Sequence, residues 1–322
     1  MDRAFQLAAR GPKFGPNPRV GCVITGPDGI VLGEGSHQGA GTPHAEVAAL
    51  EDARRRGAGV AGATVYVTLE PCNHHGRTGP CSRALVEAGV RKVLYALTDP
   101  NPAATGGSAY LKARGVEVEG DVDPGRALAL NRAWAHSMTT GRPYVTLKLA
   151  ASLDGRSAAA DGSSQWITGA ASRSHAHAKR AEVDAIMVGT GTFLADRPKL
   201  SARRPDGSLY EHQPLRVVVG ERAINDPDYL HVRTHDPAQV LRQLASREIR
   251  HVLLEGGPGL ATAFVRAGLV NQIDCYLAPA LLGAGGLASL GLLGIESVDQ
   301  ALRWRTRYLE RIGDDVFIEV GR

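Results

Sequence analysis

The sequence predicts an α/β protein built from two domains. Strand-like runs rich in Val, Ile and Leu alternate with segments of helical spacing along the chain, and Gly or polar residues separate them. The chain has 322 residues, 43% of them hydrophobic, which is long for a single core. A helical stretch ends at Gly141 and a new strand-like run follows it. We therefore place the boundary near residue 143, giving domains of residues 1–143 and 144–322.

The first domain begins with two short strands within residues 20–33, joined by a Gly-Pro-Asp-Gly turn. A helix follows from Pro43, because Val47, Leu50 and Ala53 recur on one side of a helical pattern. The run "ATVYVTLEPC" is rich in β-formers, and a second helical pattern starts at Cys81. Strands are predicted at "KVLYAL" and "GVEVEG", and one helix at "GRALALNRAWAHSMTTG" closes the domain.

The second domain repeats the alternation of strands and helices. Strand-like runs are "AIMVGTGTF", "LRVVVGE", "HVLLEGGPG" and "QIDCYLAPAL", each followed by Gly or polar residues. Helices are predicted at "SRSHAHAKRAEV" and "LATAFVRAG". A succession of this kind is typical of layered α/β architectures.

Composition restricts the class of protein. The N-terminus has no continuous apolar run, which predicts neither a signal peptide nor a membrane-spanning helix. Four cysteines are too few for a disulfide-stapled secreted chain, so we expect a cytoplasmic protein. The net charge of +4 arises from 37 basic and 33 acidic residues spread along the chain, a balance that suits a phosphorylated small molecule.

The segment "PCNHHGRTGPC" raises the question of what its cysteines and histidines bind. His44, Cys72 and Cys81 supply an imidazole and two thiolates, the donors that Zn²⁺ prefers, and three protein ligands leave a fourth position open for water. His44 and Cys81 each begin a predicted helix, whose positive end lowers thiol pKa, so Cys81 is expected to ionise readily. A redox disulfide, or a closed structural zinc site with His74 or His75 as fourth ligand, are the alternatives.

Glu46 favours the catalytic interpretation. It lies two residues after His44, in position to move protons to a leaving amine, while zinc lowers the pKa of a bound water. His-x-Glu followed by Pro-Cys is typical of zinc nucleobase deaminases. In that pattern two residues separate the cysteines, whereas eight separate Cys72 from Cys81. Cys22 and Cys275 lie in apolar strands and are expected in the core.

The second domain contains glycine-rich turns that suit a dinucleotide. "LLEGGPGLATAF" predicts a strand, a tight turn and a helix whose first amides face a pyrophosphate. It departs from the Rossmann fingerprint because Thr262 stands where Gly or Ala is required, and "VGTGTFLAD" departs through Leu194. Ordinary strand-to-helix turns therefore remain an alternative.

The first domain resembles a known family. "GPNPRVGCVI", "HAEVAAL", "EPCNHHGRTGPC" and "DPNP" are similar to the deaminase half of the bifunctional riboflavin-biosynthesis enzyme, which implies a cytidine-deaminase-like fold. The family's loop pattern P-C-x-H-x-G-x-T-x-P-C is matched by Pro71, Cys72, His74, Gly76, Thr78, Pro80 and Cys81. Gly79 stands where a proline is usual, and "KFGPNP" departs from the usual lead-in.

The second domain resembles the reductase half of the same enzyme through "LKLAASLDGR", "SQWIT", "TFLADRPKLSAR" and "LLEGGPGLA". The resemblance implies a dihydrofolate-reductase-like fold and NADPH as cofactor. The cofactor-binding residues it implies are Ala150, Trp166, Thr192, Asp196, Gly257, Pro258, Gly259, Leu260, Ala261, Thr262 and Ala263. The substrate-binding residues it implies are Ser164, Arg180, Leu200, Arg203 and Glu255.

The implied residues suit these roles chemically. Arg180 and Arg203 offer planar donors for a ribose phosphate, and Glu255 can accept from sugar hydroxyls. We expect Lys148 to be catalytic by polarising the reacting sugar carbon. Family members have Asp-Ser where this chain has Gly220-Glu221, so recognition of the cofactor's 2′-phosphate is expected to differ, with Arg222 as a candidate.

The predicted function is a two-step reaction on a phosphorylated pyrimidine. The first domain deaminates 2,5-diamino-6-(5-phosphoribosylamino)pyrimidin-4-one with zinc and Glu46, and the second reduces the ribosyl group of the product with NADPH. A deaminase acting on a flipped nucleic-acid base is one rival, but it requires an aromatic-studded basic face, and aromatic residues are 5% of this chain. The other rival, a purely structural zinc module, leaves Glu46 without a use. We expect no nucleic-acid or membrane partner, and the resemblance implies a homo-oligomer.

Overall fold

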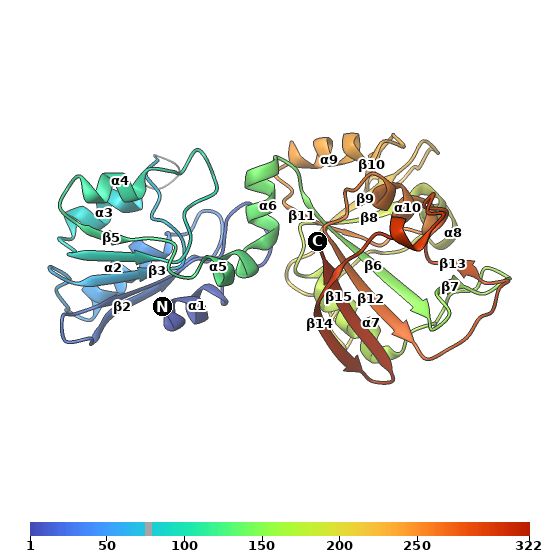
Figure 1. Ribbon diagram of the computed structural model, residues 1–322, viewed down its shortest axis with the longest axis horizontal. Coiled ribbons are helices and arrows are strands. Elements are labelled where there is room, and N and C mark those ends of the chain that lie inside the picture. Colours follow the sequence, from blue (N-terminus) through green and yellow to red (C-terminus); the bar gives the residue numbers. More distant parts are fainter. Residues whose placement is uncertain (75–78) are drawn as a thin grey trace. The chain divides into compact units, whose positions relative to one another are not determined.

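The computed structural model describes residues 1–74 and 79–322 (Figure 1). The chain folds into two units, Met1–Gly141 and Arg142–Arg322. The expected boundary, residue 143, lies beside this division. In the described part of the chain, no helix combines the length and apolar character needed to span a membrane.

The first unit is built on a five-stranded sheet in the order β2-β1-β3-β4-β5. β1 pairs antiparallel with β2 and β3, whereas β3, β4 and β5 run parallel. Its strands are β1 (Gly21–Thr25), β2 (Val31–Ser36), β3 (Thr64–Val67), β4 (Lys92–Tyr95) and β5 (Glu117–Glu119). Its helices are α1 (Asp2–Ala8), α2 (Ala45–Arg55), α3 (Cys81–Glu87), α4 (Gly107–Lys112), α5 (Pro124–Leu130) and α6 (Arg132–Thr140).

Helix α2 lies directly on β1 and β2 because glycines face it. A Cβ added to Gly35 would lie 2.3 Å from the carbonyl oxygen of Ala45, and one added to Gly33 would lie 2.3 Å from that of Ala49. Any larger residue would push the helix away from the sheet. The two glycines thereby fix the height of the first turn of α2, which carries His44 as its N-cap.

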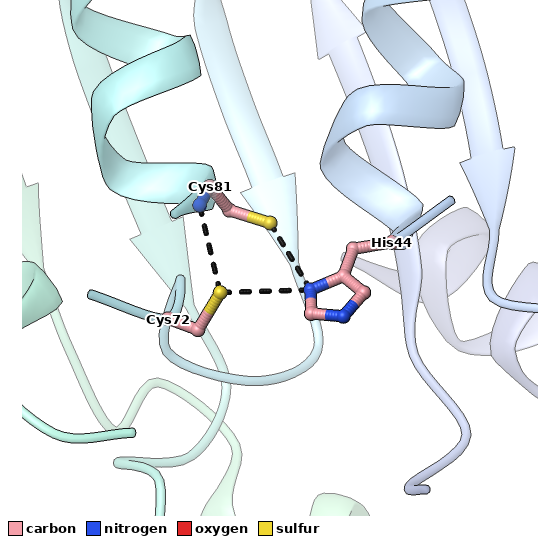
Figure 2. Close-up of side chains that lie close together, drawn as sticks. All are labelled: His44, Cys72 and Cys81. Atoms are coloured by element: carbon pink, nitrogen blue, oxygen red, sulfur yellow. Dashed lines mark hydrogen bonds between the residues drawn. The ribbon is translucent and has the colours of Figure 1, made fainter. Parts of the chain in front are cut away.

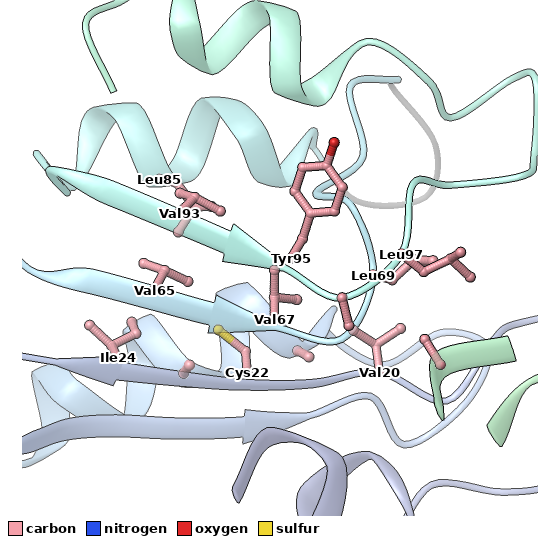
Figure 3. Close-up of a cluster of buried hydrophobic side chains, with 14 of the residues drawn as sticks. Val20, Cys22, Ile24, Val65, Val67, Leu69, Leu85, Val93, Tyr95 and Leu97 are labelled. Atoms are coloured by element: carbon pink, nitrogen blue, oxygen red, sulfur yellow. The ribbon is translucent and has the colours of Figure 1, made fainter. Parts of the chain in front are cut away.

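The core of this unit lies between the sheet and its helices (Figure 3). Val65 and Val67 from β3 and Val93 from β4 are fully buried, which the alternating pattern of strand side chains produces. Cys22 lies within this cluster, as predicted, and burial raises the pKa of its thiol well above the ordinary value. It therefore acts as a small apolar residue.

The second unit contains an eight-stranded sheet in the order β10-β9-β8-β11-β6-β12-β15-β14. The strands from β10 to β12 in this order are parallel, and β15 and β14 are antiparallel additions at one edge. The strands are β6 (Tyr144–Ser152), β8 (Ala185–Gly189), β9 (Leu215–Val219), β10 (Leu230–Val232), β11 (His251–Leu254), β12 (Gln272–Ala278), β14 (Arg305–Ile312) and β15 (Asp315–Gly321). A separate pair is formed by β7 (Arg156–Ala158) and β13 (Leu287–Ala288).

Four α-helices and a 3₁₀ turn complete this unit: α7 (Ala170–Arg180), α8 (Thr190–Asp196), α9 (Pro237–Ala245), α10 (Pro258–Arg266) and η1 (Val298–Gln300). Central strands β8 and β11 are buried along nearly their whole length, as expected for a parallel sheet covered on both faces. The carboxyl ends of β8 and β11 lead into α8 and α10, so both helices begin at one edge of the sheet.

Three sequence-based predictions are corrected by the structure. The run "AIMVGTGTF" is strand only to Gly189, which caps helix α8, so the predicted strand is four residues too long. The single helix predicted before Gly141 is two helices broken at Asn131, whose side chain is bonded to the backbone of Arg19 at 2.8 and 2.9 Å. Cys275 is only partly buried and is not a core residue.

Candidate active sites

Three candidate ligands in the first unit meet around one point (Figure 2). The Nδ1 atom of His44 lies 3.5 Å from Cys72 Sγ and 3.3 Å from Cys81 Sγ, and the three ligand atoms all lie within 4.8 Å of one another. Ligands of a single tetrahedral Zn²⁺ are separated by roughly 3.5 Å, given the usual Zn–N and Zn–S bond lengths. The donor set and its spacing therefore fit zinc.

The fold delivers these ligands from three different elements. His44 is the N-cap of α2, Cys72 lies in the loop that follows β3, and Cys81 is the first residue of α3. Parallel strands β3 and β4 end on the same side, and the loop after β3 reaches the start of α3 there. The predicted position of His44 and Cys81 at helix starts is confirmed.

The two thiols differ in acidity. Hydrogen bonds from Cys81 and His44 lower the pKa of Cys72 to about 4, against the opposing effect of burial. The hydrogen bond to Cys72, together with burial, raises the pKa of Cys81. In the site without metal these contacts favour the charge on Cys72 over Cys81, and the ready ionisation of Cys81 stays a prediction. A bound cation would hold both as thiolates.

Glu46 lies beside the ligands and is 4% exposed, in the first turn of α2. Burial, reinforced by the nearby charge of Cys72, raises the pKa of its carboxyl to about 7. A carboxyl with a pKa near neutrality is suited to accept a proton and return it within one reaction cycle.

A histidine to which the sequence assigned no role supports His44. His37 is buried, its Nδ1 lies 3.0 Å from the carbonyl oxygen of Pro43, and its Nε2 lies 2.9 Å from the side-chain Nδ2 of Asn17. Its ring also meets the ring of His44 edge-on at 5.4 Å. These contacts hold Pro43, the residue before His44, and one side of the His44 imidazole. The sequence signal was weak, because His37 is seven residues from the nearest ligand.

A buried carboxylate fixes the other side of the cysteine loop. Glu70 is 5% exposed and accepts backbone hydrogen bonds from Ser108 at 2.9 Å and from Asp99 at 3.3 Å. The side chain of Ser82 donates to Asn73 at 2.8 Å, which ties the residue after Cys72 to the first turn of α3. The sequence motif containing Asp99 thus supports the ligand loop directly.

The closed structural site is not supported by the residues described. His74 is not among the residues whose ligand atoms gather at this point. His75, the other candidate for a fourth ligand, lies outside the described residues, as do Gly76 and Thr78 of the family's loop pattern.

The second unit contains a cavity of about 500 Å³, called here the larger cavity, at the carboxyl ends of β8 and β11. It is bordered by residues from β6, from the loop before α7, from α8 and from the glycine turn before α10. The predicted residues that line it are Lys148, Ala150, Ser164, Trp166, Arg180, Thr192, Asp196, Leu200, Glu255, Gly257 and Pro258.

A smaller cavity of about 440 Å³ adjoins it and shares Gly191, Thr192, Gly257 and Pro258 with it. Predicted residues Gly259, Leu260 and Ala263 line the smaller cavity, together with Thr234 and His235 beyond β10. The amide of Gly257, the N-cap of α10, donates to Thr192 Oγ1 at 3.1 Å, and a Cβ added to Gly257 would lie 3.2 Å from the same atom. The turn is therefore drawn tightly against α8.

Three predicted residues line neither cavity. Ala261 is fully buried in the core, and Thr262 Oγ1 donates to the carbonyl oxygen of Pro258 and accepts from the amide of Gly291. Arg203 Nε donates to Ser201 Oγ at 2.8 Å. The geometry gives the side chains of Ala261 and Thr262 a packing role instead of a ligand contact.

Arg180 and Glu255, predicted as separate substrate contacts, bind each other. Arg180 Nε and Nη2 donate to the two carboxylate oxygens of Glu255, both at 2.7 Å, and Nη1 donates to the carbonyl oxygen of Ser201 at 3.1 Å. Burial opposes ionisation of Glu255, but the charge and hydrogen bonds of Arg180 lower its pKa to about 2. Arg180 therefore lines the larger cavity while it holds Glu255, and its predicted contact with the substrate stays a prediction.

Lys148 projects from the middle of β6 into the larger cavity. Burial lowers its pKa, and the charge of Glu255 partly offsets this effect. Its Nζ lies 5.8 Å from the centre of the Tyr276 ring, on the neighbouring strand β12. An amine held in this way can donate a hydrogen bond or a proton to a molecule in the cavity.

The turn after β9 explains one departure seen in the sequence. Gly220 has a φ of +133°, and a Cβ added there would lie 2.5 Å from Thr190 Oγ1, so a residue with a side chain is excluded at this close approach. Among the described residues that line the smaller cavity, Arg222 is absent and His235 is the titratable one. The candidate Arg222 thus gains no support from the geometry.

Comparison with known families agrees with this division of the chain. Residues 1–97 match the family model of the cytidine and deoxycytidylate deaminase zinc-binding region, and residues 143–318 match that of the RibD C-terminal domain. The riboflavin biosynthesis protein RibD of Mycobacterium tuberculosis strain H37Rv is 49% identical over 95% of this chain and 91% of that protein. RibD of Escherichia coli K12 is 38% identical over 99% of this chain and 98% of that protein.

Solved structures show the same similarity along the whole chain. Acinetobacter baumannii RibD superposes with a TM-score of 0.90, at 37% identity over 99% of this chain and 97% of that chain. The diaminohydroxyphosphoribosylaminopyrimidine deaminase/5-amino-6-(5-phosphoribosylamino)uracil reductase of Thermotoga maritima gives a TM-score of 0.89, at 31% identity over 100% and 97% of the two chains. The chain therefore belongs to the RibD family of riboflavin-biosynthesis enzymes, which join a deaminase and a reductase in one polypeptide.

Proposed function

We propose that the first unit deaminates 2,5-diamino-6-(5-phosphoribosylamino)pyrimidin-4-one and that the second reduces the ribosyl group of the resulting uracil to a ribityl group with NADPH. The observation that carries the proposal is the convergence of His44, Cys72 and Cys81 with the buried Glu46 beside them. The names of the relatives, including the Thermotoga deaminase/reductase, support the choice of substrate.

In the first unit, His44, Cys72 and Cys81 would hold Zn²⁺, which when bound activates water for attack on the amine-bearing C2. Glu46 takes up a proton from that water and delivers it to the amine that leaves as ammonia. Its raised pKa, caused by burial, suits both halves of this transfer. His37 and Glu70 hold the ligand loops in place through their hydrogen bonds to the backbone.

In the second unit, the two adjoining cavities fit a dinucleotide. The amides at the start of α10 and the tight Gly257 turn suit a diphosphate, because a helix N-terminus attracts anions and a glycine permits close approach. NADPH would supply hydride to C1′ of the open-chain sugar. Cofactor contacts are proposed for Ala150, Trp166, Thr192, Asp196, Gly257, Pro258, Gly259, Leu260 and Ala263, which line the cavities.

Lys148 and Glu255 are the proposed polar groups at the reacting sugar. Lys148 donates a hydrogen bond near C1′ and supplies the proton that the adjacent nitrogen gains when C1′ is reduced. Glu255, held in its ionised form by Arg180, accepts from sugar hydroxyls. Ser164 and Leu200 border the same cavity and are proposed substrate contacts.

A paired assay tests the whole proposal. Purified protein of known zinc content is given the diaminopyrimidine ribonucleotide, first without cofactor and then with NADPH. We expect ammonia release in the first stage and NADPH oxidation only after it. Ammonia release without NADPH oxidation would reject the proposed reductase step, and the absence of both signals from zinc-loaded protein would reject the substrate.

We also propose that the enzyme is a cytoplasmic homo-oligomer. All four cysteines are free, which suits a reducing compartment. Strand β14 ends the large sheet and exposes Tyr308 and Leu309 by 50% and 62%, and exposed edge strands commonly pair with another chain. Light scattering of the purified protein tests this, and a monomer at all concentrations would reject it.

A further inference from the structure

One wall of the larger cavity comes from strands that lie outside the large sheet. β7 and β13 pair antiparallel, with Ala158 opposite Leu287, and the two strands lie side by side in Figure 1. We call this pair the β7–β13 ribbon. The cavity-lining residues of the ribbon, with the residue that follows β13, are Ser157, Ala158, Leu287 and Ser289. A two-stranded ribbon is only marginally stable by itself, so its position depends on the contacts at its base.

Asp154, in the turn between β6 and β7, binds the chain at this base. Its carboxylate accepts from the backbone amide of Gly283 at 2.7 Å and from that of Leu282 at 3.2 Å. It also accepts at 2.6 Å from the hydroxyl of Ser152, the last residue of β6. Leu282 and Gly283 follow β12 and precede β13. One carboxylate therefore holds the chain that enters each strand of the ribbon.

The same turn also holds the chain that leaves β13. The carbonyl oxygen of Gly155 accepts from the backbone amide of Ser289 at 3.1 Å and from its hydroxyl at 3.0 Å. Ser152 Oγ, which donates to Asp154, accepts from the amide of Arg156 at 3.0 Å. The turn is thus bonded to the chain on both sides of β13. Because β6 lies inside the large sheet, between β11 and β12, these bonds fix the ribbon relative to that sheet.

Asp154 is ionised at neutral pH. The hydrogen bond from Ser152, with those from the amides of Leu282 and Gly283, lowers the pKa of its carboxyl to about 2. An ionised carboxylate only accepts hydrogen bonds, and these three groups all donate to it. An asparagine of the same size would turn an NH₂ group toward one of these donors. The contacts at the base of the ribbon therefore require the carboxylate.

We propose that Asp154 is a positioning residue of the reductase site, which holds the β7–β13 ribbon in place as a wall of the larger cavity. The inference rests on the proposed function, which places the cofactor and the substrate in the two cavities. Lys148 and Glu255, the groups proposed to act at the reacting sugar, belong to β6 and to the turn after β11 and not to the ribbon. Release of the ribbon should therefore weaken ligand binding more than it slows the chemical step.

The kinetic test compares the full chain with its variant Asp154→Asn in both reactions. We expect the KM of the reductase for NADPH or for its pyrimidine substrate to rise by about tenfold, the effect of losing a hydrogen bond to a charged group. The kcat of reduction should change by less than about threefold. Ammonia release by the first unit should stay unchanged. A merely structural role would instead reduce the amount of folded reductase, which lowers the measured kcat and leaves both KM values unchanged.

Limited digestion with trypsin gives a measurement that does not depend on activity. Trypsin cleaves after arginine, and Arg156 is the first residue of β7. Cleavage there requires the ribbon to open, and the rate of cleavage follows the population of the opened form. We expect cleavage after Arg156 to be about tenfold faster in Asp154→Asn, in line with the loss of one such hydrogen bond. Fragment masses identify the site, and the other cleavage sites should be cut at the unaltered rate.

Asp206→Asn is the matched control. Asp206 also accepts from a backbone amide and a hydroxyl, those of Ser208 at 2.9 and 2.7 Å, in an exposed turn of the same unit. Among the described residues that line the two cavities it is absent, so this variant should behave as the unaltered enzyme. Unchanged KM values in Asp154→Asn, or cleavage after Arg156 at the unaltered rate, would overturn the proposal. If the unaltered enzyme oxidises no NADPH, the proposed function fails, and the digestion still shows whether Asp154 holds the ribbon.

Discussion

Arg180 on α7 and Glu255 after β11 are joined by two parallel hydrogen bonds, both of 2.7 Å, and their side chains are only 18% and 8% exposed. The pair links a helix to the central sheet at the wall of the larger cavity. It also keeps a buried carboxylate ionised, since the nearby guanidinium lowers the pKa of Glu255 to about 2. A single contact thus compensates the burial of the Glu255 carboxylate and sets the charge that the cavity presents to a substrate.

Arg180→Ala should destabilise the second unit strongly, because it leaves the Glu255 charge buried without its partner. Losing one member of a buried pair costs about 3–5 kcal/mol, whereas replacing both with apolar residues is often neutral. We therefore expect the double variant Arg180→Met, Glu255→Leu to unfold in urea at a higher concentration than Arg180→Ala. Both proteins should lack reductase activity. A double variant no more stable than the single one would contradict this account.

Glu46→Gln should abolish ammonia release while reduction of the deaminated intermediate continues, because the two sites lie in separate units. Losing a general acid–base group lowers rates by about 10²–10⁴-fold. The measurement is ammonia release and NADPH oxidation on the same preparation, each with its own substrate. Glu51→Gln, on the exposed side of the same helix, is the control and should keep both activities. Parallel loss of the two activities in Glu46→Gln would count against separate sites.

Cys81→Ser should reduce the bound zinc and ammonia release together, because three protein ligands leave none in reserve. Metal analysis after dialysis against a chelator, with and without added zinc, measures this. Cys275→Ser replaces a partly buried cysteine of the other unit and should keep the zinc content unchanged. Retention of full zinc by Cys81→Ser would show that another donor completes the site.

The metal site was predictable because its ligands follow local signals. His44 and Cys81 stand at helix starts that the hydrophobic spacing already marks, and the soft donors select the metal. The strands β1, β3, β8 and β11 were likewise found from short apolar runs. The alternation of these elements was sufficient for the fold class.

Long-range partners could not be predicted. Nothing near Arg180 in the sequence indicates that its guanidinium is bonded to Glu255, a residue 75 positions away. The break at Asn131 likewise depends on its side chain reaching the backbone of Arg19, 112 residues earlier. Strand β10, helix α9 and the β14–β15 hairpin were not predicted. β10 has only three residues and β14 is mostly exposed, so both carry little apolar periodicity. Helix α9 buries Val240, Leu241 and Leu244 on one side, so its sequence did carry a helical signal that the prediction missed.

His251 gives the second unit a measurable dependence of stability on pH. Burial, with the charge of Lys179 added, lowers the pKa of His251 from 6.5 to about 3, and Nε2 lies 2.9 Å from Thr146 Oγ1. In the unfolded chain this histidine takes up a proton below about pH 6.5, whereas in the folded protein it stays neutral down to about pH 3. The unfolded state thus binds more protons than the folded state in this window. The contribution of His251 to the stability of the folded protein is therefore complete above about pH 6.5 and decreases as the pH falls.

The expected loss from this one group is up to about 1.4 kcal/mol per pH unit. His251→Gln, which has no titrating group and can still bond to Thr146, should reduce that slope. Urea unfolding of both proteins at about pH 7.5 and about pH 5.5 gives the comparison, and contributions from the first unit cancel because both proteins share it. Equal slopes for the two proteins would mean that His251 is not held neutral by its surroundings.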